Sequence, residues 1–183
     1  MILVFEGVDA SGKTTVGKQL ASLHSRGVYY PTPPPSLKAL RDAVDRSASN
    51  EDHYSFYLEA VKVASREMAL FDPTALVVVD RYWLTTYVYH RAMGMSVDRD
   101  DFLNLLMPDY TVYLDVSHDV QMRRLEVRGM SAGDVRMLSR QNDIRSYYDE
   151  HLHLRMNGEI IRFNTDLLSP NELVELISKR ISA

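Results

Sequence analysis

Residues 7–14, Gly-Val-Asp-Ala-Ser-Gly-Lys-Thr, follow the spacing G-x-x-x-x-G-K-[ST] of a loop that holds nucleotide phosphates. The apolar run 2–5 before them predicts a buried strand, and residues 15–23 after them predict a helix. Such a unit directs backbone N–H groups and a helix N-terminus at one point, which favours a phosphate over a chance match. We expect Lys13 to reach the β- and γ-phosphates and Thr14 to bind Mg²⁺. The residues expected at the ATP phosphates are Asp9, Ala10, Ser11, Gly12, Lys13, Thr14 and Thr15.

A second pair of chemically active residues, Asp80 and Arg81, follows the apolar run 75–79. Ligands gather at the carboxyl ends of parallel strands. Asp80 could therefore bind Mg²⁺ or accept the proton of an attacking group, while Arg81 could hold a phosphate with two N–H groups. An ordinary ion pair at a strand end is the alternative. The phosphate-binding loop favours the functional interpretation.

Four arginines, Arg123, Arg124, Arg128 and Arg136, surround a glycine-containing stretch at 128–134. Such charge often marks a solvated helix face, and Glu126 neutralises part of it. Phosphoryl transfer, however, spreads negative charge over the transferring oxygens, and arginines can stabilise that charge. We therefore predict a mobile lid over about 123–137.

Aromatic side chains at 56, 57, 82, 83, 87 and 89 could include a platform that stacks on a base, although such residues more often build the core. The histidines at 90, 118, 151 and 153 do not have the spacing of zinc ligands.

Five apolar runs at 2–5, 27–30, 75–79, 110–114 and 159–163 alternate with helical patterns. Helices are expected at 15–23, 36–46, from Asn50 or Asp52 to 70, 84–93, 98–107, 117–127, 134–154 and 169–182. This alternation predicts an α/β domain with a parallel sheet covered on both faces. With 183 residues, we expect one domain, residues 1–183.

Composition excludes several classes of protein. The net charge of −4 argues against binding to a nucleic-acid polymer, and the lack of cysteine excludes disulfides and thiolate metal sites. No apolar run has the length of a membrane span, and residues 1–6 lead straight into the loop without a signal peptide. We expect a cytoplasmic protein.

Several motifs resemble those of the thymidylate kinases. Residues 5–15 are similar to the opening F-E-G-x-D-x-x-G-K-T-T, and residues 80–89 to D-R-Y-x-x-S-x-x-A-Y. Residues 108–116 are similar to P-D-x-T-x-x-L-D-V, and 124–129 to R-x-x-x-R-G. The resemblance implies a three-layer P-loop NTPase fold with a five-stranded parallel sheet, ATP and Mg²⁺ as donor and cofactor, and a homodimer.

The resemblance also implies roles on the acceptor side. Asp9 would bind the acceptor sugar, Arg81 its phosphate, Tyr89 the deoxyribose, and Thr86 and Phe56 the base. Because Ala10 is small, the catalytic arginine would come from the lid, where Arg124, Arg128 and Arg136 are the candidates. The chain departs from the family at Pro31–Pro35, where no arginine occurs before Arg41, and at Ala60, where the family has a base-reading arginine.

We therefore predict an ATP- and Mg²⁺-dependent kinase that phosphorylates a nucleoside monophosphate, with dTMP to dTDP as the favoured reaction. The catalytic residues would be Lys13, Asp80, Arg81, Arg124 and Arg128, and the metal ligands Thr14 and Asp80. One alternative is a deoxynucleoside kinase, whose acceptor is a sugar hydroxyl. Another is a P-loop protein that binds nucleotide without transferring phosphate.

Overall fold

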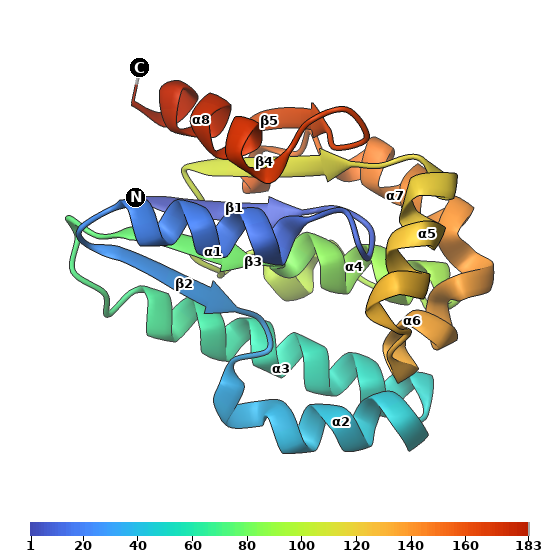
Figure 1. Cartoon of the computed structure of the whole chain (residues 1–183). Helices are drawn as coiled ribbons and strands as arrows, with labels where there is room; N and C mark the ends of the chain where they lie inside the picture. Colours follow the sequence, from blue (N-terminus) through green and yellow to red (C-terminus); the bar gives the residue numbers. More distant parts are fainter. Residues whose placement is uncertain (183) are drawn as a thin grey trace.

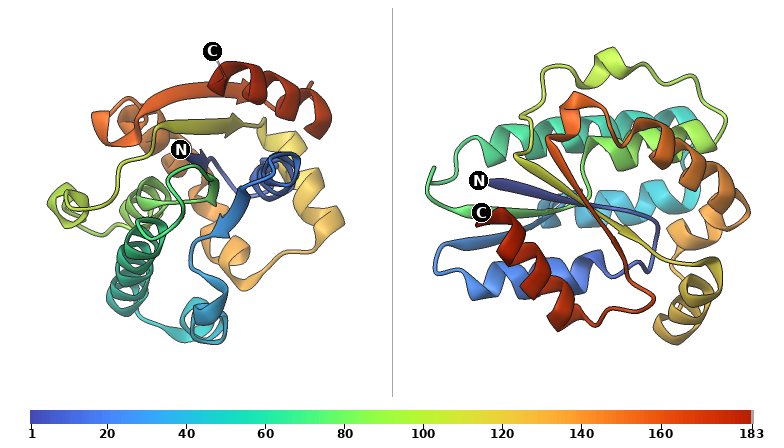
Figure 2. Two further views of the ribbon diagram at one scale, coloured as in Figure 1. Left: turned by 90° about the vertical axis from the view of Figure 1, so that its left-hand side faces the viewer. Right: turned by 90° about the horizontal axis from the view of Figure 1, so that it is seen from above.

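The computed structural model describes residues 1–182 and contains a five-stranded parallel sheet (Figures 1 and 2). The strands lie in the order β2-β3-β1-β4-β5. Their bounds are β1 Ile2–Glu6, β2 Gly27–Pro31, β3 Leu76–Asp80, β4 Tyr110–Asp115 and β5 Glu159–Asn164. β1 lies between β3 and β4, so the loop that follows it leaves the middle of the sheet. Phe5 pairs with Asp80, which places the end of β3 beside the start of this loop.

Helices cover both faces of the sheet (Figure 1). α1 (Lys13–Leu23) and α8 (Pro170–Ile181) contact one another on one face. α3 (Asn50–Met68), α4 (Trp83–Ala92) and α7 (Gln141–His151) pack in sequence on the other. α2 (Lys38–Ser47) packs on α3 and also contacts α6 (Ala132–Met137). α5 (His118–Arg128) and α6 lie beyond the carboxyl ends of the strands.

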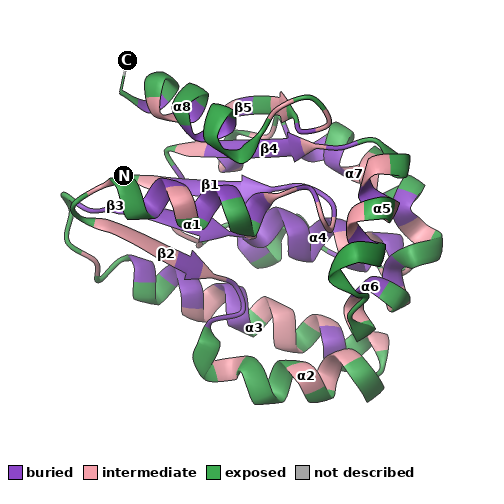
Figure 3. Cartoon of the chain, viewed as in Figure 1, coloured by how far each residue is buried: buried purple, intermediate pink, exposed green. Residues whose placement is uncertain are grey.

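The core consists of two apolar layers separated by the sheet (Figure 3). Leu3 and Phe5 of β1 belong to the layer under α1 and α8, and Val4 belongs to the layer under α3 and α4. Successive side chains of a strand point to opposite faces, so a strand covered on both sides needs apolar residues throughout. This explains the continuous apolar runs in the sequence.

Three predicted helix features were wrong. The segment 134–154 is not one helix but α6, a 3₁₀ turn at Leu138–Arg140 and α7. The turn lets α6 reach α2 while α7 packs on α4, which one straight helix could not do. Residues 98–107 contain only the 3₁₀ turn Arg99–Phe102, where Phe102 alone is buried. The cap of α3 is Ser49, whose Oγ accepts a hydrogen bond from the Asp52 amide at 3.1 Å.

The remaining short elements are two further 3₁₀ turns, Pro35–Leu37 and Arg155–Asn157. Within residues 1–182, none of the helices combines the length and the apolar character needed to span a membrane.

Candidate active site

The loop between β1 and α1 is held in a conformation that brings its backbone close to neighbouring strands. Gly7 has φ 137°, and a Cβ at this position would lie 2.4 Å from the Leu114 carbonyl oxygen, so only glycine fits. Gly12 and Ala10 also have positive φ, at 102° and 59°. The loop borders a cavity of about 880 Å³, here called the donor cavity. All seven residues predicted at the ATP phosphates line it: Asp9, Ala10, Ser11, Gly12, Lys13, Thr14 and Thr15.

Lys13 is buried, and within residues 1–182 no carboxylate is in direct contact with it. Its Nζ donates to the Val8 carbonyl at 2.6 Å and to Ser11 Oγ at 3.2 Å. Burial, together with the nearby charge of Arg81, lowers the pKa of Lys13 to about 7. Keeping Lys13 protonated in this buried position therefore costs free energy. An anion in the donor cavity would offset that cost.

This pKa predicts proton uptake on nucleotide binding. At pH 8 most of Lys13 is neutral in the free protein, and phosphate oxygens nearby would raise its pKa again. Calorimetric titration with ADP at pH 8, in buffers of different ionisation enthalpy, should show uptake of up to about one proton per site. The same titration at pH 6 should show much less. Equal uptake at both pH values would contradict the prediction.

The Thr14 hydroxyl and the Asp80 carboxylate lie side by side, at the start of α1 and the end of β3. Thr14 Oγ1 donates to Asp80 Oδ2 at 2.5 Å, and the Tyr29 hydroxyl donates to the same oxygen at 2.6 Å. Mg²⁺ bound through phosphates commonly takes only one or two protein ligands and fills the rest of its shell with water. Over residues 1–182 the structure has no cluster of three or more His, Asp or Glu side chains suited to a metal. The donor set at Thr14 and Asp80 thus fits Mg²⁺ delivered with a nucleotide.

Arg81 forms a second polar centre at the end of β3. It has φ 70°, a left-handed conformation uncommon for arginine, and its guanidinium forms an ion pair with Asp9. The Tyr89 hydroxyl donates to the other Asp9 oxygen at 2.8 Å, and Arg81 Nη1 lies 3.3 Å from that hydroxyl. Burial opposes ionisation of Asp9, but the charges of Arg81 and Lys13 outweigh it and lower the pKa of Asp9. Arg81, Asp9 and Tyr89 therefore form a charged, hydrogen-bonded group next to the phosphate loop, here called the clamp.

Glu6 supports this clamp, and sequence reasoning missed it. Its Oε1 accepts hydrogen bonds from the backbone amides of Tyr82 and Thr85 at 3.0 and 3.2 Å. The Tyr148 hydroxyl donates to Oε2 at 3.1 Å. Burial raises the pKa of Glu6. These bonds fasten the turn after Arg81 to β1, and the signal available in the sequence was the glutamate of the F-E-G motif.

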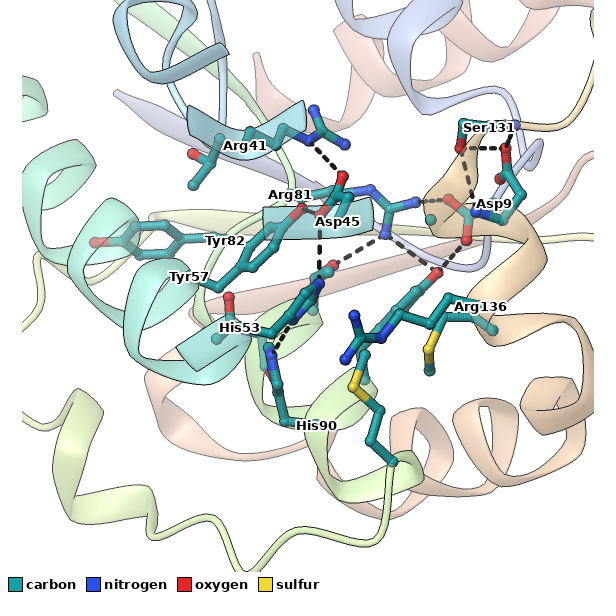
Figure 4. Close-up of a pocket in the computed structure, with 18 residues that line it drawn as sticks. Asp9, Arg41, Asp45, His53, Tyr57, Arg81, Tyr82, His90, Ser131 and Arg136 are labelled. Atoms are coloured by element: carbon teal, nitrogen blue, oxygen red, sulfur yellow. Dashed lines mark hydrogen bonds and ion pairs between the residues drawn. The ribbon is translucent and has the colours of Figure 1, made fainter. Parts of the chain in front are cut away.

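Figure 4 shows the residues that line a smaller cavity of about 80 Å³, here called the acceptor cavity. This cavity adjoins the donor cavity. The two share the residues Asp9, Thr32, Arg41, Arg81, Ser131 and Asp134. Asp9, Arg81, Thr86 and Tyr89, all predicted on the acceptor side, line the smaller cavity. Phe56 does not line it, whereas its neighbour Tyr57 does. Helical geometry turns adjacent residues about 100° apart, so the sequence could not decide between the two.

One wall of the acceptor cavity is a chain of hydrogen bonds. His90 Nδ1 must donate to the Thr86 carbonyl at 2.6 Å, because a carbonyl can only accept. His90 Nε2 lies 2.8 Å from His53 Nδ1, and His53 Nε2 lies 3.3 Å from Asp45 Oδ1. Burial lowers the pKa of His90 to about 4, so this ring is neutral at pH 7 and accepts from His53. The Thr86 carbonyl, His90, His53 and Asp45 thus form one continuous chain of polar contacts.

The buried His90 predicts a loss of stability in acid. Its pKa is about 6.5 unfolded and about 4 folded, so the unfolded chain gains the proton first as the pH falls. Between pH 6.5 and 4 this residue should cost about 3 kcal/mol of stability. Urea unfolding across that range should give a flatter pH dependence for His90→Gln than for the wild type. Parallel curves would contradict the assignment.

The arginines of the predicted lid separate in space. Arg124 Nη1 donates to the Ala10 carbonyl at 3.2 Å and to Thr165 Oγ1 at 2.9 Å. Arg128 pairs with Asp134 at 2.6 Å, and both Arg124 and Arg128 line the donor cavity. Arg123 is exposed and lines neither cavity, and Arg136 lines only the acceptor cavity. The structure thus brings two of the four arginines to the phosphate loop.

Residues 5–176 match the sequence model of one protein family, Thymidylate kinase. The chain belongs to the thymidylate kinase family. This confirms the predicted resemblance and the predicted class of enzyme, a transferase acting on nucleoside monophosphates. It favours that class over the nucleoside-kinase alternative.

Relatives from methanogens agree with this assignment. A protein from Methanococcus aeolicus named as a probable thymidylate kinase is 28% identical over 187 residues, which cover 98% of this chain and 92% of that protein. One from Methanococcus vannielii, named likewise, is 30% identical over 130 residues, which cover 69% of this chain and 66% of that protein. The match therefore spans just under two thirds of the second relative.

Solved structures confirm the P-loop fold. The thymidylate kinase from Candida albicans superposes with a TM-score of 0.79 at 16% identity, covering 99% of this chain and 90% of that one. The deoxyadenosine kinase from M. mycoides with bound dATP gives a TM-score of 0.72, also at 16% identity, with 100% of both chains covered. At 16% identity, these two similarities are evidence for the fold alone. Kinases of both acceptor types share it, so the acceptor must be argued from the site.

Proposed function

We propose that this member of the thymidylate kinase family transfers the γ-phosphoryl group of ATP to the phosphate of dTMP, which yields dTDP and ADP. The observation that carries the proposal is the meeting of the two cavities at Arg81 and Asp9. ATP in the donor cavity and a monophosphate in the acceptor cavity would bring their phosphates together there. The family assignment supports dTMP as the acceptor.

On the donor side, the loop amides and Lys13 hold the phosphates, and Thr14 with Asp80 holds Mg²⁺. When bound, Mg²⁺ neutralises part of the phosphate charge. Arg124 and Arg128 supply positive charge from the lid side of the cavity, where it stabilises the transferring group. Arg81 orients the acceptor phosphate for attack in line with the bond that breaks.

The hydrogen bonds of Asp80 favour a phosphate acceptor over a sugar hydroxyl. A hydroxyl acceptor needs a base to take its proton, whereas a phosphate oxygen is already anionic at neutral pH. Asp80 Oδ2 accepts from Thr14 and from Tyr29 and faces the donor cavity, so it is placed as a ligand of the donor side. Asp9 is engaged by Arg81 and Tyr89. One oxygen of Asp80 and both oxygens of Asp9 are therefore already engaged within the protein.

The family resemblance further leads us to propose a homodimer that works in the cytoplasm. Light scattering coupled to gel filtration should give twice the chain mass of 21.0 kDa. A mass of one chain at micromolar concentration would refute the dimer.

A panel of acceptors tests the proposed reaction. With saturating MgATP, the protein should convert dTMP to dTDP and leave thymidine unphosphorylated, as measured by chromatography of the products. Phosphorylation of thymidine without turnover of any monophosphate would overturn the proposal in favour of a nucleoside kinase. ATP binding without turnover of any acceptor would favour a non-catalytic protein.

A further inference from the structure

The acceptor cavity contains one cation that no carboxylate neutralises within the described residues. Arg136 Nη2 donates to Asn50 Oδ1 at 2.7 Å, and both terminal nitrogens lie 3.4 Å from the Ala48 carbonyl oxygen. Both acceptors are uncharged. A guanidinium has five N–H groups, so donors remain available. Figure 4 shows Arg136 extending from α6 towards the histidine pair.

The neighbouring polar groups of this wall already have partners. Asp45 accepts from the Tyr57 hydroxyl at 2.8 Å and pairs with Arg41 at 3.4 Å in addition to His53. His90 is held by the Thr86 carbonyl and by His53. These groups shape the cavity, but their hydrogen bonds are used within the protein. Among the described residues of this cavity, Arg136 differs from Arg41 and Arg81 because no carboxylate is paired with it.

The position of Arg136 assigns it to the base of the acceptor. The acceptor phosphate belongs at the junction, where Arg81 lies, and the sugar belongs next to Asp9 and Tyr89. The base then extends away from the donor cavity, along the wall formed by Tyr57 and the histidines. Arg136 lines this part and not the donor cavity, unlike Arg124 and Arg128.

We propose that Arg136 is a specificity-determining residue that donates to a carbonyl oxygen of the acceptor base, so that the enzyme prefers a thymine- or uracil-type base to cytosine. This rests on the proposed function. Both bases have a carbonyl at ring position 2, but at position 4 uracil has a carbonyl where cytosine has an amino group, and the ring nitrogen beside it carries a hydrogen only in uracil; the 4-carbonyl is the oxygen assigned to Arg136. A guanidinium carries donors only, so opposite an amino group both partners would be left unpaired. Arg136 is half-buried, and a site that pairs such a donor with the base discriminates against a ligand that lacks the acceptor.

The short helix α6 links this contact to the phosphates. Asp134, three residues into α6, caps the helix through Ser131 and pairs with Arg128 at the donor cavity. Arg136 lies two residues further along the same helix. α6 therefore contains both Arg136, which is proposed to contact the base, and Asp134, which pairs with Arg128 at the donor cavity.

The test compares two acceptors that share the sugar and the phosphate and differ only along this edge of the base. Values of kcat/KM for dUMP and dCMP are measured with saturating MgATP in wild type, Arg136→Gln, Arg136→Lys and the control Arg46→Gln. Arg46 is exposed on α2 and lines neither cavity. We expect the wild type to prefer dUMP, and Arg136→Gln to lower the dUMP/dCMP ratio about tenfold or more, mainly through KM for dUMP. Arg136→Lys should lower it less, and Arg46→Gln should leave it unchanged.

An equal loss for dUMP and dCMP, or no preference in the wild type, would overturn the inference. So would a loss confined to kcat, which would place Arg136 in the transfer step. If the wild type phosphorylates no monophosphate at all, the proposed function has failed instead. Thermal unfolding monitors folding of each variant. If Arg136→Gln does not fold, the ratio measured for Arg136→Lys decides, because lysine retains the charge and much of the packing on α6.

Discussion

Replacing Lys13 by alanine should lower kcat by roughly 10²–10³-fold or more. Lys13 is the buried cation of the phosphate loop, and its Nζ donates to Ser11 Oγ and the Val8 carbonyl, which positions it for the donor phosphates. Removal leaves the developing charge between the β- and γ-phosphates without its nearest partner. A coupled assay of ADP formation with dTMP as acceptor measures the effect.

Lys18→Ala is the matched control, since Lys18 is exposed on the same helix and lines neither cavity. It should retain wild-type kcat. Full activity in the Lys13 variant would remove the phosphate loop from the proposed site. Calorimetry with ADP should also show that the proton uptake at pH 8 disappears in Lys13→Ala, which ties both predictions to one side chain.

Replacing Arg81 by lysine should lower kcat/KM for dTMP by about 10²-fold, with a smaller change in KM for ATP. Lysine keeps the charge that Asp9 requires but cannot hold a phosphate with two N–H groups, as the guanidinium can. Arg81→Ala should additionally destabilise the fold by about 3–5 kcal/mol, because it leaves the partly buried carboxylate of Asp9 without its partner.

Initial rates at varied dTMP, together with urea unfolding, separate the two effects of Arg81. Arg180→Lys serves as control, since Arg180 pairs with Glu159 on the exposed side of α8. An unchanged kcat/KM for dTMP in Arg81→Lys would show that Arg81 does not hold the acceptor phosphate with two N–H groups. If Arg81→Ala were as stable as the wild type, the ion pair with Asp9 would not contribute to folding.

Much of the sheet could be predicted from the sequence, because strands buried on both faces require continuous apolar runs. Each predicted strand occurs within one residue of its expected bounds. The helix ends at Gly129 and Ser169 were predicted for a related reason, since glycine with positive φ and a serine cap act over a few residues. The break inside 134–154 could not be predicted, because only the packing of α6 on α2 and of α7 on α4 makes it necessary.

The site shows the same difference between features that depend on local sequence, on the donor side, and features that depend on packing, on the acceptor side. The residues predicted at the ATP phosphates are consecutive, so their spacing alone was enough to predict them. The acceptor side is assembled from α2, α3, α4 and α6, whose relative positions depend on packing between elements far apart in the sequence.

By itself, therefore, the sequence determined a parallel α/β domain, a phosphate-binding loop and membership of a kinase family, all of which depend on local patterns. Only the tertiary structure decided that Tyr57 rather than Phe56 faces the acceptor cavity, and that Arg136 lies apart from Arg124 and Arg128. The positive charge of an arginine is known from the sequence. Which part of a ligand the arginine can contact depends on the cavity that it lines in the folded protein. For Arg136 that direction is set by the bend between α6 and α7.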